Sequence, residues 1–287
     1  MEAPENLQML PGNRFTNSKR EDLIEKAEEL KINQSVHKDS DNQIPYNYIQ
    51  SGGQFHTNTF MNTCVLDSLL AAIHIAAKQH PKINHLFMWD PIISAVQVFM
   101  DCGRYNEAKA LWLINLDEKN EGEKQFMQSD HIDIRGYPRE HLPNFLDLTC
   151  AKFNYDEERR SPHPEDHIYS MTISKFEHLG EVRALGKRIN PELILVDVDG
   201  RIKGFPDLSI TDDYEREFKL QFLLLGMMTE TSNHMVMCTR LDGGWQLYDN
   251  MKNPLFRHVN IDDICAQDYV VHLVAYVNVS PENEKQD

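Results

Sequence analysis

One cysteine lies where a polar loop gives way to a strongly apolar segment. Cys64, in FMNTCVLDSLL, follows Asn62 and Thr63 and opens a run that is apolar almost all round. Such a run predicts a buried helix that has Cys64 in its first turn. The unpaired N–H groups and the positive end of the dipole at a helix start favour a thiolate over a thiol. Cys64 is therefore a candidate nucleophile, although most cysteines are merely small buried hydrophobic residues.

A base and a residue to orient it lie near the other end of the chain, in TETSNHMVMCTRLDGGWQLYDN. His234 opens one expected strand, and Asp249 closes the next one after the turn LDGGW, so antiparallel pairing brings their two ends together. Asn250 follows directly and offers an amide for the same role. A histidine held at its other nitrogen by a carboxylate or an amide is the base that an activated cysteine needs. Adjacent residues at a strand end point to opposite sides, and we favour Asp249.

The other histidines give weaker patterns. His163 and His167 lie in the proline-broken segment DEERRSPHPEDH, which predicts a loop and does not supply helical metal-ligand spacing. His74 falls on the apolar run after Cys64 and is interpreted as a core histidine with satisfied nitrogens. No phosphate-binding glycine loop and no dinucleotide motif occurs. We therefore expect no cofactor and no metal.

The elements that must position these residues change in type along the chain. The helical patterns come first: VLDSLLAAIHIAAK, PIISAVQVFMDCG and YNEAKALWLINL, with REHLPNFLDLTCAKF as a further amphipathic segment. Short apolar or alternating runs follow and predict strands: PELILVDVDG, EFKLQFLLLGMM, HMVMCTRL, GWQLYD and DYVVHLVAYVNV. Helices followed by a run of strands predict an α+β fold, with the helices segregated from an antiparallel sheet.

The first part of the chain differs from the rest. It is polar and carries one helical pattern, REDLIEKAEELK, in which Leu23, Ile24, Ala27 and Leu30 share a face. We expect an N-terminal arm at 1–53, a catalytic domain at 54–280 and a disordered tail at 281–287. The helix of the arm is expected to pack on the domain or to remain solvated, and a partner-binding role is the less favoured alternative.

Composition excludes some classes of function. The 287 residues carry a formal net charge of -16, which disfavours a nucleic-acid partner, because such binding needs clustered Lys and Arg. The five cysteines form no CxxC pair, which argues against a disulfide framework and a cysteine zinc site. No membrane-spanning run and no signal-peptide pattern is found. We expect an intracellular protein, cytoplasmic or nuclear.

Two segments carry a resemblance to a known family. MNTCVLDSLL resembles the cysteine box of ubiquitin-specific proteases, and NHMVMCTRLDGGWQLYDN resembles their histidine box, followed by a closing strand similar to VVHLVAYVN. The resemblance spans roughly Gln54 to Val279 and is confined to these boxes and the run EFKLQFLLLGMM. It implies a papain-like cysteine protease fold. In that fold a helical subdomain carries the cysteine on a buried helix, which packs against a C-terminal antiparallel sheet that carries the histidine and the aspartate.

The resemblance also suggests an oxyanion donor. The family usually places an asparagine five residues before the nucleophile, but that position is Thr59 here. Asn58, one residue further back, matches the position where more distant papain-like enzymes carry glutamine, and it is our first choice. Asn62 is the competitor, and we expect it mainly to shape the turn and to cap the helix. The zinc-binding fingers of the family are absent, so a compact, divergent member is expected.

The function implied by the resemblance is that of a thiol isopeptidase or peptidase. It would cleave after the C-terminal glycine of ubiquitin or a ubiquitin-like modifier, which would be its partner. Two alternatives stay open: a catalytically inactive scaffold that binds such a modifier, and another papain-like acyl transferase or peptidase. The residues do not identify the modifier, the linkage or the oligomeric state.

Overall fold

A computed structural model describes residues 12–35, 48–119, 130–145, 149–153, 167–179, 191–200, 205–212, 214–228, 233–241, 243–267 and 269–280. The described helices are α1 (Gly12–Ser35), α2 (Cys64–Gln79), α3 (Pro81–Trp89), α4 (Pro91–Asp101), α5 (Tyr105–Lys119), the 3₁₀ helix η2 (Pro138–Phe145) and α6 (Ile261–Ala266). Helix α4 begins where Pro91 supplies a preset φ and the Asp90 carboxylate accepts the N–H groups of Ile92 and Ile93. It ends before Gly103, whose φ of 67° suits a residue without Cβ.

The strands form two sheets. A small sheet has the order β1-β2-β3, from β1 (Gln54–Phe55), β2 (Asn58–Met61) and β3 (His131–Asp133). The large sheet has the order β11-β10-β9-β8-β12-β6-β5-β4, and β7 also pairs with β8. Its strands are β4 (Thr149–Phe153), β5 (Ile168–Ile173), β6 (Leu193–Val198), β7 (Ser209–Thr211), β8 (Glu217–Met228), β9 (Asn233–Leu241), β10 (Gly244–Tyr248), β11 (Phe256–Val259) and β12 (Tyr269–Asn278).

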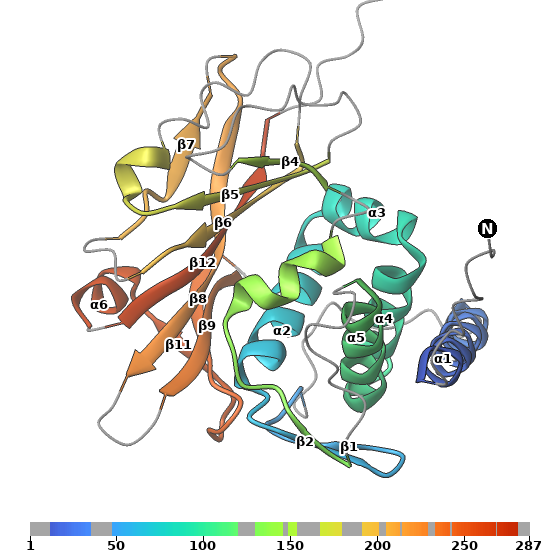
Figure 1. Cartoon of the computed structure of the whole chain (residues 1–287). Coiled ribbons are helices and arrows are strands. Elements are labelled where there is room, and N and C mark those ends of the chain that lie inside the picture. Colours follow the sequence, from blue (N-terminus) through green and yellow to red (C-terminus); the bar gives the residue numbers. More distant parts are fainter. Residues whose placement is uncertain are drawn as a thin grey trace, which may run out of the picture.

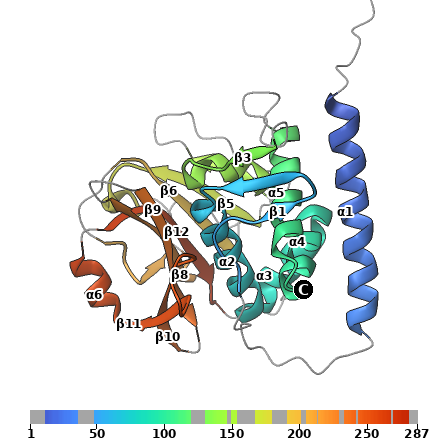
Figure 2. The same cartoon turned by 90° about the horizontal axis from the view of Figure 1, so that it is seen from below.

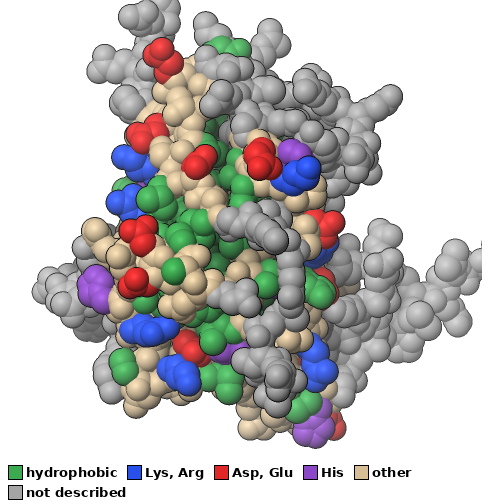
Figure 3. All heavy atoms as spheres, turned by 90° about the vertical axis from the view of Figure 1, so that its left-hand side faces the viewer, with side chains coloured by type: hydrophobic (Ala, Val, Ile, Leu, Met, Phe, Trp, Pro, Cys, Tyr) green, Lys and Arg blue, Asp and Glu red, His purple; other side chains and the backbone are tan. Residues whose placement is uncertain are grey.

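The helices cover one face of the large sheet. Helix α2 lies directly against the sheet, α3 to α5 lie beyond it, and α1 runs along the far side (Figures 1 and 2). The apolar run of β8 supplies both faces in alternation. Phe222 and Leu224 join the core under the helices, whereas Leu223 and Leu225 join a second cluster on the opposite face. Figure 3 shows hydrophobic side chains gathered in the middle of that opposite side.

The α+β class and the order of helices before strands agree with the prediction, but the sheet is mixed and not antiparallel. Strands β4, β5 and β6 run parallel to one another, and the remaining neighbours are antiparallel. The difference arises in two places: β5, for which no strand was predicted, and the segment 139–153, which was predicted to be one amphipathic segment. It divides into η2, which contains Pro143, and the strand β4. Proline interrupts the backbone hydrogen bonds of a longer helix.

The boundary expected at residue 53 also differs from the packing. Tyr48 and Ile49 are almost fully buried, and the Tyr248 hydroxyl donates to the Ile49 carbonyl at 2.5 Å. Tyr48 and Ile49 therefore belong to the core of the domain, although the sequence placed them in the arm. Helix α1 packs on α4 and α5 through Leu23 and Ala27. The rest of the arm, 1–11 and 36–47, and the tail 281–287 lie outside the described residues.

Candidate active site

Cys64 is the first residue of α2. Asn62 precedes the helix with a φ of 54°, a conformation that asparagine tolerates better than most residues, and it redirects the chain from β2 into α2. The Cys64 side chain is partly exposed, whereas the next turns of the helix are buried. The thiol thus lies at the solvent-facing end of a buried helix, next to backbone N–H groups that have no partner within the helix.

His234 and Asp249 form a close pair at the ends of β9 and β10. The His234 Nε2 atom lies 2.8 Å from Asp249 Oδ1, and the two side chains are 15% and 12% exposed. The same Asp249 oxygen accepts the N–H of Met251 at 3.0 Å, which fixes the carboxylate. Antiparallel pairing of β9 with β10, closed by a turn at Gly243, brings the two strand ends together.

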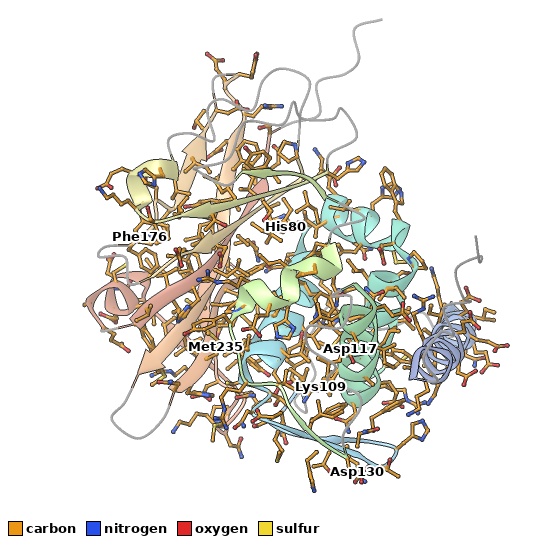
Figure 4. All side chains as sticks on the ribbon, viewed as in Figure 1. His80, Lys109, Asp117, Asp130, Phe176 and Met235 are labelled. Atoms are coloured by element: carbon orange, nitrogen blue, oxygen red, sulfur yellow. The ribbon has the colours of Figure 1, made fainter. Side chains whose placement is uncertain are left out.

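The sheet also holds this pair against the helix that carries Cys64. Helix α2 packs on β9, and the Ser68 hydroxyl, one turn after Cys64, donates to the Met235 carbonyl at 3.4 Å. Figure 4 shows Met235 on β9 beside α2. A hydrogen bond with Cys64 and, after the opposing effect of burial, the hydrogen bond and charge of Asp249 raise the pKa of His234 above its ordinary value. The arrangement stabilises an imidazolium next to a thiol.

A cavity of about 610 Å³ opens over these groups. Its lining includes Cys64, His234, Tyr137, Gly226 and His272. A Cβ atom on Gly226 would lie 2.6 Å from His272 Nε2, so a larger residue there would displace the histidine side chain. The cavity gives a substrate access to the thiol.

The two asparagines considered as oxyanion donors lie in different places. Asn62 lines the cavity, and its Nδ2 donates to Asp133 Oδ1 at 2.9 Å. Asn58 is buried in β2, opposite Phe55, and is not part of the cavity lining. A strand advances about 3.3 Å per residue, so β2 carries Asn58 away from the start of α2. The helix-capping task expected of Asn62 is not observed, because Thr63 occupies the N-cap and the Asn62 amide binds β3.

Asn250 points away from His234. Its Nδ2 donates to Asp67 Oδ2 at 2.7 Å, inside the protein.

Two buried charged residues near the site, Asp67 and Lys109, were not predicted from the sequence; they form an ion pair at 2.8 Å. A charged residue in the otherwise apolar run VLDSLLAAI was the signal that could have singled out Asp67, because a buried carboxylate needs a partner. Nothing in the sequence around Lys109 identifies that partner.

His74 is a buried histidine with both ring nitrogens engaged. Its Nδ1 lies 2.7 Å from the Tyr48 hydroxyl and its Nε2 lies 2.9 Å from Asp101 Oδ1. His163 lies outside the described residues. Within the described ranges, no group of three or more His, Cys, Asp and Glu side chains is arranged to hold a metal ion. Among the helices of those same ranges, none is long and apolar enough to cross a membrane.

Comparisons with known proteins give distant structural matches. No protein-family model matches the chain, and no curated protein matches its sequence. Among solved structures, one match is a chain of the SAGA Ubp8/Sgf11/Sus1/Sgf73 DUB module bound to ubiquitin aldehyde, with 10% sequence identity and a TM-score of 0.46; the match covers 83% of this chain and 70% of the matched chain. A variant of the module bound to monoubiquitin has 10% identity and a TM-score of 0.45, and the match covers 90% of this chain and 76% of the matched chain. A yeast SAGA DUB module has 10% identity and a TM-score of 0.43, and the match covers 84% of this chain and 68% of the matched chain. Because these TM-scores are below 0.5, we rest the proposed function on the site.

Proposed function

We propose that the chain is a papain-like cysteine peptidase in which Cys64 is the nucleophile, His234 the base and Asp249 the residue that orients the base. The observation that carries this proposal is the His234–Asp249 pair, with Nε2 2.8 Å from Oδ1, at the edge of a cavity that Cys64 also lines. A hydrogen bond with Cys64 is the largest cause of the raised pKa of His234. Because Nε2 of His234 is held by Asp249, Nδ1 is the nitrogen that serves Cys64. This is the nucleophile, base and orienter relationship of thiol hydrolases.

The chemistry is acyl transfer in two steps. The Cys64 thiolate adds to the scissile carbonyl, and the His234 imidazolium gives its proton to the leaving amine as the C–N bond breaks. A thioester on Cys64 remains. His234 then takes a proton from water, the resulting hydroxide adds to the thioester, and the C–S bond breaks to release the acid and the thiolate. Asp249 keeps the imidazole in the orientation that both proton transfers need.

The oxyanion of the tetrahedral intermediate forms beside Cys64. The backbone N–H of Cys64 and the Asn62 amide are the donors that this geometry favours, since Asn62 lines the cavity and Asn58 does not. An amide group carries two donor hydrogens, so a bond to Asp133 leaves Asn62 a second one. A preorganised donor of this kind contributes roughly 3 kcal/mol to the transition state.

The substrate class in the proposal is a conjugate of ubiquitin or a ubiquitin-like modifier that is cleaved after the C-terminal glycine. Two features support it: the resemblance of the segments around Cys64 and His234 to ubiquitin-specific proteases, and the cavity that gives a modifier tail access to the thiol.

A panel of modifier proteins with a C-terminal electrophile tests the proposal directly. We expect one or more members, ubiquitin or a ubiquitin-like protein, to form a covalent adduct that mass spectrometry places on Cys64, with Cys64→Ala as the unreactive control. A folded protein that reacts with none of the panel yet cleaves an unrelated peptide would redirect the proposal to another papain-like peptidase. Binding without an adduct would favour a scaffold.

A further inference from the structure

A buried cluster of polar groups lies directly behind the proposed catalytic residues. The Lys109 side chain is 1% exposed and the Asp67 side chain is fully buried, with Nζ 2.8 Å from Oδ1. Lys109 comes from α5, where Figure 4 labels it, and Asp67 from the first turn of α2. The reaction proposed above uses neither charge, and a buried ion pair is by itself weak evidence for a stabilising role.

The cluster contacts three segments that meet at the site. Lys109 Nζ also donates to the carbonyls of Gln50 at 2.9 Å and Gly52 at 2.5 Å, which belong to the segment before β1. On the other side, the second oxygen of Asp67 accepts the Thr63 hydroxyl at 2.6 Å and the Asn250 amide at 2.7 Å. The lysine ammonium thus donates two hydrogen bonds to backbone carbonyls and forms an ion pair with Asp67 Oδ1.

The partners of Asp67 are the immediate neighbours of the catalytic residues. Thr63 precedes Cys64, and its hydroxyl also accepts the N–H of Gly52 at 2.8 Å. Asn250 follows Asp249, and the backbone carbonyl of Asn250 accepts the N–H of Ser51 at 3.2 Å. One carboxylate therefore connects the residue before the nucleophile with the residue after the orienting aspartate, and one lysine connects that carboxylate with the loop that contacts both.

We propose, on the basis of the function proposed above, that Asp67 and Lys109 are positioning residues that fix the separation of Cys64 from the His234–Asp249 pair. Each contact is short and buried, so the backbone at Thr63 and at Asn250 cannot move independently while the ion pair is intact. Burial raises the pKa of the Asp67 carboxyl, and Lys109 opposes that rise, followed by the hydrogen bonds from Thr63 and Asn250. Lys109 is thus the counter-ion that keeps Asp67 able to accept both hydrogen bonds.

Two variants separate a positioning role from a purely structural one. Lys109→Met leaves a buried carboxylate without its counter-ion and is expected to lower the melting temperature substantially. The double variant Asp67→Asn/Lys109→Met removes both charges and is expected to regain most of that loss, because the cost of breaking one partner of a buried pair is not incurred. Asn115→Ala is the matched control: it also removes a buried hydrogen bond on α5, at 2.9 Å to Asn144, but it has no contact with the cluster.

The kinetic expectation differs from the stability expectation. The substrate for kinetics is a cleavable conjugate of the modifier whose electrophile probe labels Cys64. In the double variant, kcat on this conjugate is expected to remain at least about tenfold below wild type, with KM within about threefold, because the transition-state geometry is lost and substrate binding is not. The rate of Cys64 alkylation by iodoacetamide at a fixed neutral pH is expected to fall severalfold, because His234 no longer lies where it stabilises the thiolate. Asn115→Ala is expected to change neither quantity.

The alkylation rate also keeps this inference separate from the proposed function. If wild-type protein shows no turnover on any modifier, the proposed function fails, and the fall in the alkylation rate alone tests the positioning of Cys64 against His234. If the double variant is folded and has the wild-type kcat and alkylation rate, the ion pair is structural and the inference is wrong. The double variant also covers the case in which Lys109→Met does not fold.

Discussion

The two ends of helix α2 each lie beside a histidine–aspartate pair with nearly the same geometry. At the start of the helix, His234 and Asp249 are 2.8 Å apart, and at its other end His74 and Asp101 are 2.9 Å apart. A cysteine lies near each pair: Cys64 lines the same cavity as His234, and Cys102 directly follows Asp101. A histidine, an acid and a thiol in proximity therefore occur twice, and only one of the two sites has the properties of a catalytic centre.

Surroundings account for the difference. Burial lowers the pKa of His74, whose second nitrogen is occupied by the Tyr48 hydroxyl, so no nitrogen remains for a thiol. Burial and the charge of Asp101 raise the pKa of Cys102 and keep it protonated. At the other end, Cys64 and Asp249 raise the pKa of His234, and a cavity admits a substrate. A histidine–aspartate distance is thus insufficient to identify a site, and the partner of the second ring nitrogen decides.

The largest expected contrast is between the two cysteines. Cys64→Ala should lower turnover by at least about 10⁴-fold, because it removes the nucleophile, and should leave the free energy of unfolding within about 2 kcal/mol of wild type. Cys102→Ala should retain nearly full turnover. Steady-state kinetics and thermal denaturation of both variants measure the contrast. Full activity in Cys64→Ala, or its loss in folded Cys102→Ala, would assign the chemistry to a different thiol.

The two aspartates should differ next. Asp249→Ala should lower kcat by about 10² to 10⁴ with little change in KM, whereas Asp101→Ala should change kcat by less than about threefold. Asp249 helps to hold the pKa of His234 up, so its loss lets the imidazolium deprotonate at lower pH. The alkaline limb of the kcat/KM profile should therefore move to lower pH in Asp249→Ala and stay in place in Asp101→Ala. An unmoved limb in both would remove Asp249 from the proposed triad.

The third contrast concerns Asn62 and Asn58. Asn62→Ala should lower kcat by roughly 10² to 10³ while Cys64 stays reactive toward a small alkylating agent, because an oxyanion donor acts on the transition state and not on the thiolate. Asn58→Ala removes a buried side chain outside the cavity, so its main effect should be a lower melting temperature. If kcat collapses in Asn58→Ala and survives in Asn62→Ala, the first choice made from the sequence was correct.

Local sequence patterns predicted the elements around the site well. The periodicity of the apolar run after Cys64 predicts a helix, and the alternation after His234 predicts a strand. The glycine-containing turn LDGGW predicts that the next strand pairs with it as a hairpin. The parallel strand β4 was missed because η2 and β4 follow one another in a single amphipathic segment, and β5, directly after the proline-broken segment, was not recognised as a strand. The Asp67–Lys109 pair was also beyond reach. Its partners come from three separate segments, and only the tertiary packing places a lysine of α5 against the start of α2.

The smallest effect on activity is expected at His74, where the outcome should appear in stability. His74→Phe keeps an aromatic ring, somewhat larger than imidazole, but leaves the buried Tyr48 hydroxyl without its 2.7 Å partner, which should cost about 1 to 3 kcal/mol of unfolding free energy.

Because burial lowers the pKa of folded His74, the unfolded chain binds more protons on this group, and wild-type stability is lost as pH falls through the ordinary histidine range near 6.5. Comparing denaturant unfolding of wild type and His74→Phe between about pH 8 and pH 5 isolates this contribution, which the variant should lack. His234 contributes with the opposite sign, since its raised pKa gives stability that is present at low pH and lost as pH rises. Equal pH dependence in wild type and variant would show that His74 is not held neutral by its surroundings, and the contrast between the two ends of α2 would then rest on the cavity alone.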